Sequence, residues 1–234
     1  MKKILLGIMI FETLIMSTFC ENLSLEMVSI PNKNFEMSKT EVTQKLYESV
    51  MGENPSKFKG ENNPVENVSW YDAISFCNKM SEKEGLQPVY TVDGKTDILN
   101  YISFKDDKIN VEIIQNPDAN GYRLPSVEEW QYAAKGGENY KYAGSNDIDE
   151  VAWYDKNSNG KTHVVAQKKA NGYGLYDISG NVNEWCWDSG FYGHYHCGGS
   201  WHGIKKYCNI RHKFSGKSDF KFQNFGFRIV RTVK

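Results

Sequence analysis

Histidine and cysteine side chains crowd into one short part of the chain, and these residue types bind metals or act as nucleophiles. They lie within 19 residues and are His194, His196, Cys197, His202, Cys208 and His212. Zinc sites usually show their ligands as close pairs at a repeated spacing. No two such pairs occur here, so the density of His and Cys alone does not predict a metal centre.

The same part of the chain is rich in aromatic residues. From Trp185 to Arg231, 12 of 47 positions are Phe, Tyr or Trp, against 14% in the whole chain. No helical or strand period runs through the middle of this segment. An irregular stretch of aromatic, histidine, serine and glycine residues is typical of a binding surface. The question is therefore whether the segment binds a ligand only or also performs chemistry.

Three helices are expected in the part of the chain before this segment. Thr40 is placed to cap a helix that runs to Met51 and ends at Gly52. A second helix begins at Ser69, has Asp72 in capping-box spacing and ends near Gly85. Its apolar face includes Cys77, which we interpret as a buried free thiol. A third begins at Ser126, with Glu129 in capping-box spacing, and ends at 136–137.

Short strands are expected around these helices, at 25–30, 35–37, 89–92, 109–114 and 225–233. No internal repeat or composition break marks a second domain. The pattern predicts an α+β fold, rich in loops, with two to three helices and short antiparallel sheets, in a single domain from 21 to 234. The net charge of −1 gives no basic field, so we do not expect nucleic acid as a partner.

The first 20 residues have the pattern of an export signal. Lys2 and Lys3 precede a broken apolar run that ends at Cys20. This run is too short for a stable membrane span. It resembles a loose bacterial lipobox, so we expect lipidation of Cys20, with an uncleaved buried helix as the alternative. The expected location is the bacterial outer membrane or cell surface, with a lipid anchor as the only membrane contact. The remaining four cysteines leave three disulfide connectivities open.

Four ordered blocks resemble a known family. They are 120–137 (NGYRLPSVEEW, then AA and GG), 171–185 (NGYGLYD, then GNVNEW), 198–201 (GGSW) and 226–228 (GFR). The segments 40–43 and 64–70 add support. In this order they resemble the formylglycine-generating enzymes, also called sulfatase-modifying factors, over residues 25–234. The resemblance implies a variant of the C-type lectin fold.

The resemblance also indicates which residues would perform the family's chemistry. Its enzymes oxidise a substrate cysteine with two cysteines separated by four residues. Here Cys208 occupies the second position but Gly203 occupies the first. One thiol cannot replace two, so we expect no enzymatic activity and no cofactor. Calcium bound by loop oxygens is another family trait, and Asn181 and Glu184 have suitable oxygen donors. Hydrogen bonding of these two side chains to nearby backbone is the alternative.

One non-catalytic branch of this fold family explains the composition of the aromatic segment. The chain is similar to the variable proteins of diversity-generating retroelements, most of all to those of Treponema, in which adenines of a C-terminal cassette are randomised. Asn codons changed in this way do not yield Lys, Glu, Gln, Met or Trp. None of these five types occurs in the nine residues from Ser189 to Cys197. We therefore expect a variable region at about 185–231, in which Cys197 and Cys208 are chance products of diversification.

This interpretation predicts a monomeric, non-enzymatic protein that binds a protein or another cell-surface ligand. The expected solvent-facing contact residues are Ser189, Phe191, Tyr192, His194, Tyr195, His196, His202, Ile204, Tyr207, Lys213, Ser218, Phe220 and Phe222. Trp185, Trp201 and Phe227 are expected in the core, and Arg228 in an internal ion pair. The alternatives are an oxidase of the formylglycine-generating type and an accessory lipoprotein. The accessory role would require burial of most of the contact residues.

Overall fold

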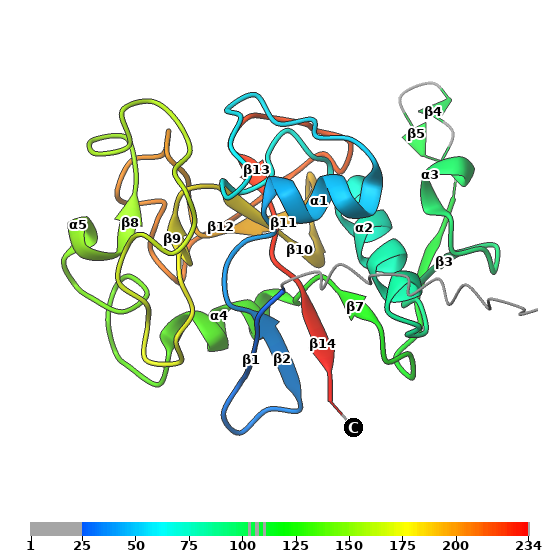
Figure 1. Ribbon diagram of the computed structural model, residues 1–234, viewed down its shortest axis with the longest axis horizontal. Coiled ribbons are helices and arrows are strands. Elements are labelled where there is room, and N and C mark those ends of the chain that lie inside the picture. Colours follow the sequence, from blue (N-terminus) through cyan, green and yellow to red (C-terminus); the bar gives the residue numbers. More distant parts are fainter. Residues whose placement is uncertain (1–24, 103, 106–107, 110, 234) are drawn as a thin grey trace, which may run out of the picture.

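The computed structural model describes residues 25–102, 104–105, 108–109 and 111–233 (Figure 1). The expected export signal and the expected lipidation site Cys20 lie outside these residues. The described helices are α1 (Gln44–Met51), α2 (Trp70–Lys83), α3 (Ile98–Tyr101), α4 (Val127–Lys135) and α5 (Ile148–Val151). Three of them are longer than one turn, and the predicted α+β class is confirmed. None of the described helices is both long and apolar enough to cross a bilayer.

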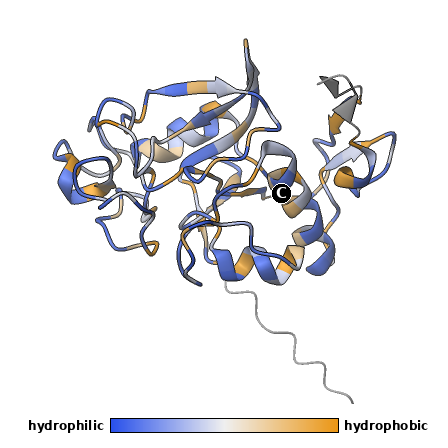
Figure 2. Cartoon of the chain, turned by 90° about the horizontal axis from the view of Figure 1, so that it is seen from above, coloured by the Kyte–Doolittle hydropathy of each residue, from blue (hydrophilic) through white to orange (hydrophobic). Residues whose placement is uncertain are grey.

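The helices begin where local hydrogen bonds favour them. Ser69 starts α2 and Ser126 starts α4, each with the predicted capping box. Gly52 ends α1 in the left-handed conformation, as expected. The prediction that Thr40 caps α1 was wrong, because the side chain of Thr43 accepts the hydrogen bond from the Leu46 backbone. The helices carry both hydrophilic and hydrophobic residues, so each has a face that can pack on the core (Figure 2).

One four-stranded antiparallel sheet joins the two ends of the domain. Its strands, in spatial order, are β1 (Met27–Ser29), β2 (Phe35–Ser38), β14 (Val230–Thr232) and β7 (Tyr122–Arg123). The predicted final strand at 225–233 is therefore divided into β14 and the separate short strand β13 (Phe225–Gly226). The two parts pair in different sheets, and Arg228 lies between them.

The second four-stranded sheet contains much of the aromatic-rich segment that begins at Trp185. Its order is β12 (Lys213–Gly216), β11 (Gly193–Cys197), β10 (Asn183–Gly190) and β13. β10 and β11 form an antiparallel hairpin with a two-residue loop, Phe191 and Tyr192, and β13 pairs with β10 in parallel. The expectation that this stretch is irregular was wrong. Residues 183–186 are all buried and the hairpin tip is mostly exposed, so burial does not alternate along β10.

The other described strands are short pairs. β3 (Tyr90–Val92) pairs with β6 (Ile113–Gln115), β4 (Phe104–Lys105) with β5 (Lys108–Ile109), and β8 (Ala152–Trp153) with β9 (Ser179–Gly180). The strand expected at 109–114 is thus divided between β5 and β6, and α3 was not expected. In Figure 1, α3 with β3 to β5 lies on one side of the molecule, and α5 with β8 and β9 lies on the other.

The core positions the hairpin firmly. Trp185, Phe227 and the apolar face of α2 belong to one buried cluster, and Trp130 of α4 packs with Cys186 and Cys197 in a second. Trp185, Trp201 and Phe227 are buried, as predicted. Cys77 is a buried free thiol, also as predicted. The base of β10 and β11 is therefore held between both clusters, while its tip extends away from them.

Candidate ligand-binding surface

The tip of the β10–β11 hairpin presents two large rings to solvent. Phe191 is 91% exposed and Tyr192 is 69% exposed, the largest values among the exposed hydrophobic side chains of the described chain. The two rings contact each other edge to face, with centroids 4.9 Å apart. Gly193 has φ +130°, and a Cβ there would lie 2.2 Å from the Gly216 carbonyl oxygen. A glycine at this position therefore allows β12 to approach the hairpin closely.

A second group of exposed apolar side chains lies after the hairpin. Ile204, Phe220 and Phe222 are exposed, and the Phe220 and Phe222 rings lie 5.4 Å apart in an edge-to-face contact. Phe214 of β12 is also exposed and was not among the predicted contacts. The sequence feature that could have indicated it is the position of Phe214 between two polar residues, Lys213 and Ser215. Exposed apolar side chains that gather in one part of a surface are a feature of interaction sites.

The structure places the predicted contact residues in three environments. The exposed ones are Ser189, Phe191, Tyr192, His202, Ile204, Lys213, Phe220 and Phe222. Four are half-buried, namely His194, Tyr195, Tyr207 and Ser218. The prediction for His196 was wrong, because its side chain is buried against the rings of Trp185 and Phe225. Its Nδ1 lies 3.3 Å from Oδ1 of Asn183. Burial lowers the pKa of His196 to about 4, so this imidazole is neutral at pH 7.

Gly203, at the first of the family's two catalytic positions, borders a small cavity. This cavity has a volume of about 340 Å³ and is lined by His196, Ser200, Gly203, Tyr207 and Phe225, among others. Cys208, at the second position, is buried and does not line this cavity, and its backbone carbonyl accepts a hydrogen bond from the Ser179 hydroxyl. All four described cysteines are buried and free. The Sγ atoms of Cys186 and Cys197 lie 3.9 Å apart, whereas Cys208 has no thiol beside it in the described chain.

Burial also changes the chemistry of the Cys208 thiol. It raises the pKa of Cys208 to about 12, so almost no thiolate is present at pH 8. We expect native protein at pH 8 to leave Cys208 unlabelled by iodoacetamide and denatured protein to label it fully. Peptide mass spectrometry with and without denaturant measures this. Labelling of native Cys208 within minutes would contradict the buried, protonated thiol.

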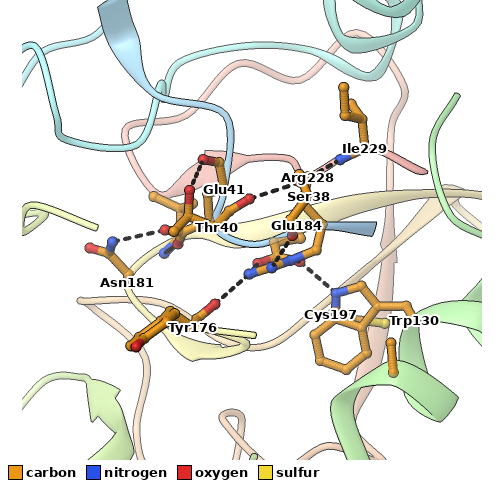
Figure 3. Close-up of polar contacts among 12 residues, drawn as sticks. Ser38, Thr40, Glu41, Trp130, Tyr176, Asn181, Glu184, Cys197, Arg228 and Ile229 are labelled. Atoms are coloured by element: carbon orange, nitrogen blue, oxygen red, sulfur yellow. Dashed lines mark hydrogen bonds and ion pairs between the residues drawn. The ribbon is translucent and has the colours of Figure 1, made fainter. Parts of the chain in front are cut away.

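The expected calcium ligands belong to a buried ion network instead (Figure 3). Both carboxylate oxygens of Glu184 accept hydrogen bonds from Arg228, at 2.7 Å each, and Oε2 also accepts from Trp130 Nε1 at 2.5 Å. Asn181 donates to Glu41 and to the His163 carbonyl. A guanidinium thus occupies the place where a cation would bind Glu184, and the residues present do not fit calcium. The expected internal ion pair of Arg228 is confirmed.

Two further buried carboxyl groups complete this network. Glu41 accepts hydrogen bonds from Asn181 and Val182, and burial raises its pKa. Oδ2 of Asp177 accepts from the Ala166 backbone at 2.6 Å, and its Oδ1 has no hydrogen-bond partner. Burial raises the pKa of Asp177 to about 6, above its usual 3.8. Among the described residues, no group of three or more His, Cys, Asp or Glu side chains could hold a metal ion.

Because the pKa of Asp177 is raised, the free energy of unfolding should depend on pH in a way that the substitution Asp177→Asn removes. A carboxyl group whose pKa is raised in the folded state favours folding at low pH, and this contribution is lost as pH rises from about 4 to 6. The loss is on the order of 1–3 kcal/mol at pH 7. Asn tolerates the φ of +55° and keeps an acceptor for the Ala166 N–H. Urea unfolding at pH 4.5 and 7 should show Asp177→Asn gaining more stability relative to wild type at pH 7 than at pH 4.5. An unchanged difference at both pH values would contradict this.

Comparison with known proteins agrees with the blocks found in the sequence. Residues 16–233 match the sulfatase-modifying factor enzyme 1-like domain. The chain belongs to this family. Among solved structures of this fold, Treponema denticola variable protein 1 superposes with a TM-score of 0.77 at 34% identity, covering 89% of this chain and 92% of that one. The structure titled CarF superposes with a TM-score of 0.72 at 32% identity, over 86% and 87% of the two chains.

Proteins that are similar in sequence to this sulfatase-modifying factor-like domain have names that describe different functions. The protein named chaperone protein LppX of Paenibacillus barcinonensis is 47% identical over 66% of this chain and 62% of its own length. The serine/threonine-protein kinase pkn1 of Chlamydia caviae is 30% identical over 49% of this chain. The aligned region spans only 22% of that kinase, so the match concerns one part of it.

Proposed function

We propose that this protein is a non-enzymatic binding protein, displayed at the cell surface, whose C-terminal residues are varied by a retroelement to change its ligand. The observation that carries this proposal is the exposure of Phe191 and Tyr192 on a hairpin whose base is fixed in the core. Exposed rings on a rigid mount give large contact area at low entropic cost. The similarity to a variable protein of Treponema denticola supports the same interpretation.

The boundary between exposed and buried residues supports diversification of the surface alone. Seven of the nine residues from Ser189 to Cys197 are exposed or half-buried. His196 and Cys197 are buried, and Cys197 lies in the core beside Cys186. We therefore propose that variation is concentrated at 189–195 and at the exposed positions after 202. Cys197 and Cys208 are scaffold residues in this proposal, not products of diversification, since both are buried.

A protein is the ligand class that we favour. The 47% identical relative is named a chaperone protein, and a chaperone binds polypeptides. We further propose that the protein acts as an exported monomer, anchored through lipid at Cys20. The Lys2–Lys3 pair and the apolar run before Cys20 support export. An accessory role with a buried C-terminal segment is disfavoured, because most predicted contact residues are exposed.

The absence of oxidase activity is part of the proposal and follows from Gly203. A single buried thiol at Cys208 cannot bind copper(I) as a thiolate pair or form the reversible disulfide of the family's enzymes. We expect purified protein supplied with copper and oxygen to leave a cysteine-containing peptide unoxidised, as measured by mass spectrometry. A sulfatase-modifying enzyme with both cysteines serves as the positive control. Turnover of the peptide to an aldehyde would overturn the binding function.

The diversification has a genetic test. We expect a near-copy of the 3′ end of the gene close to the gene itself, differing mainly at adenines and lying beside a reverse-transcriptase gene. Differences spread evenly over all four bases, or no such copy, would contradict diversification and leave an invariant binding surface.

A further inference from the structure

A second cavity lies between the hairpin and the start of α2, apart from the exposed rings. Its volume is about 450 Å³, within the range of about 300–1,000 Å³ for pockets that bind small molecules. Trp70 and Tyr71 of α2 form one wall, and Trp187 and Asp188 of β10 form another, with His194 of β11 beside them. Val111 and Ile113 close the remaining side.

Aromatic rings dominate this cavity. The Trp70 and Trp187 rings lie 5.3 Å apart, and Tyr71 meets Trp70 edge to face at the same distance. His194 stacks on Trp70 with centroids 3.6 Å apart, and Tyr90 stacks on Trp187 at 4.9 Å. Trp187 is only half-buried, so part of its ring remains accessible from the cavity. Tryptophan rings attract cations that lie within about 6 Å of the ring centre.

An acidic group lies in the same wall. Oδ2 of Asp188 accepts a hydrogen bond from the Val127 backbone at 2.5 Å, and within the described chain no Lys or Arg forms an ion pair with Asp188. Lys221, a cation near the start of α2, is paired with Asp72 at 2.8 Å. His194 is neutral at pH 7, because burial lowers its pKa to about 4. The cavity therefore has an unbalanced negative charge beside tryptophan rings.

The backbone of β10 is irregular where it contributes to the cavity. The register of β10 against β11 shifts between Trp185 and Ser189, which includes Trp187 and Asp188. Bulges of this kind redirect side chains and are frequent beside functional sites. The backbone N–H of Trp187 bonds to the Pro125 carbonyl instead of to β11, so the irregular stretch is fixed by the α4 region.

We infer that this cavity binds the side chain of an arginine presented by a protein ligand. A guanidinium is planar, stacks on aromatic rings and matches a carboxylate with two hydrogen bonds. The inference rests on the proposed function, since the arginine belongs to the ligand that the hairpin contacts. Trp70 precedes the expected variable region, and Trp187 is of a type that a randomised Asn codon does not yield, so both form a constant part of the site. Ser189 and His194 at its edge are the parts open to variation.

The test uses the whole protein and two small probes that differ only in charge. N-acetyl-arginine amide and N-acetyl-citrulline amide have nearly the same shape, and citrulline lacks the positive charge. Titration of each is followed by tryptophan fluorescence. We expect saturable quenching by the arginine probe, weakened by added salt, and none by the citrulline probe. Equal quenching by both probes, or none by either, would overturn the inference.

A matched pair of variants locates the effect. Asp188→Asn keeps an acceptor for the Val127 N–H and removes the charge, and it should weaken binding of the arginine probe about two- to fivefold. Asp155→Asn removes the same charge from an exposed residue outside the cavity and should leave binding unchanged. Thermal unfolding checks that both variants are folded. Wild-type affinity in folded Asp188→Asn would also overturn the inference. Neither result depends on the Phe191–Tyr192 tip, so the proposed function can stand if this inference fails.

Discussion

Replacing Arg228 with Met should lower the free energy of unfolding by about 3–5 kcal/mol, the usual cost of leaving a buried charge without its partner. Arg228 and Glu184 are both fully buried, and the guanidinium also donates to the carbonyls of Ser38 and Tyr176. Met keeps the length of the side chain and its apolar stem. The loss therefore reports chiefly on Glu184, which then lies near Asp177 and Glu41 without the guanidinium that it binds in wild type.

A matched arginine provides the control. Arg231 pairs with Glu36 at 3.1 Å, but both side chains are partly exposed. Arg231→Met should cost about 0–1 kcal/mol. Chemical unfolding of the two variants and wild type measures both effects. The double variant Arg228→Met/Glu184→Gln should recover part of the loss, because it removes the stranded charge. Equal losses in the two single variants would show that the Glu184–Arg228 pair does not hold the base of β10.

Replacing both hairpin-tip rings should strongly weaken binding and leave the free energy of unfolding nearly unchanged. We expect Phe191→Ser/Tyr192→Ser to weaken binding at least about 30-fold, since exposed aromatic anchors at the centre of an interface contribute about 2 kcal/mol or more. The free energy of unfolding should change by no more than about 0.5 kcal/mol, because neither ring is buried. Binding is measured by flow cytometry on cells that retain the labelled wild-type protein.

The control for this variant removes exposed apolar surface elsewhere. Tyr140 and Val164 are 40% and 38% exposed and lie outside the hairpin and the segment after it. Tyr140→Ser/Val164→Ser should bind the same cells as wild type. Equal loss of binding in both double variants would mean that nonspecific hydrophobic contact, not the hairpin tip, retains the protein on the cells.

The helices could be predicted from sequence because their starting signals are local. Ser69 with Asp72 and Ser126 with Glu129 are three residues apart, and both capping boxes formed. Thr40 and Thr43 are equally good candidates by this criterion. The structure uses Thr43, and the backbone of Val42 just before it pairs with Phe227 and Val65, which are distant in sequence.

The hairpin and the exposure of its residues depend on contacts between distant parts of the chain. His196 is buried against the rings of Trp185, Phe214 and Phe225, and Phe225 lies 29 residues further along the chain. The aromatic cavity brings Trp70 next to His194, more than 120 positions away. No local pattern predicts such pairings. The exposed tip could be predicted, because its aromatic and glycine residues have no period that would place them in a core.

Sequencing the 3′ end of this gene across a growing population tests the central claim most directly. We predict substitutions at codons for exposed residues, such as Phe191, Tyr192 and Phe222. We predict that the codons for the buried residues Trp185, Glu184 and Arg228 do not vary. A gene end without variation, or variation that falls equally on buried and exposed positions, would contradict a diversified binding surface on a fixed scaffold.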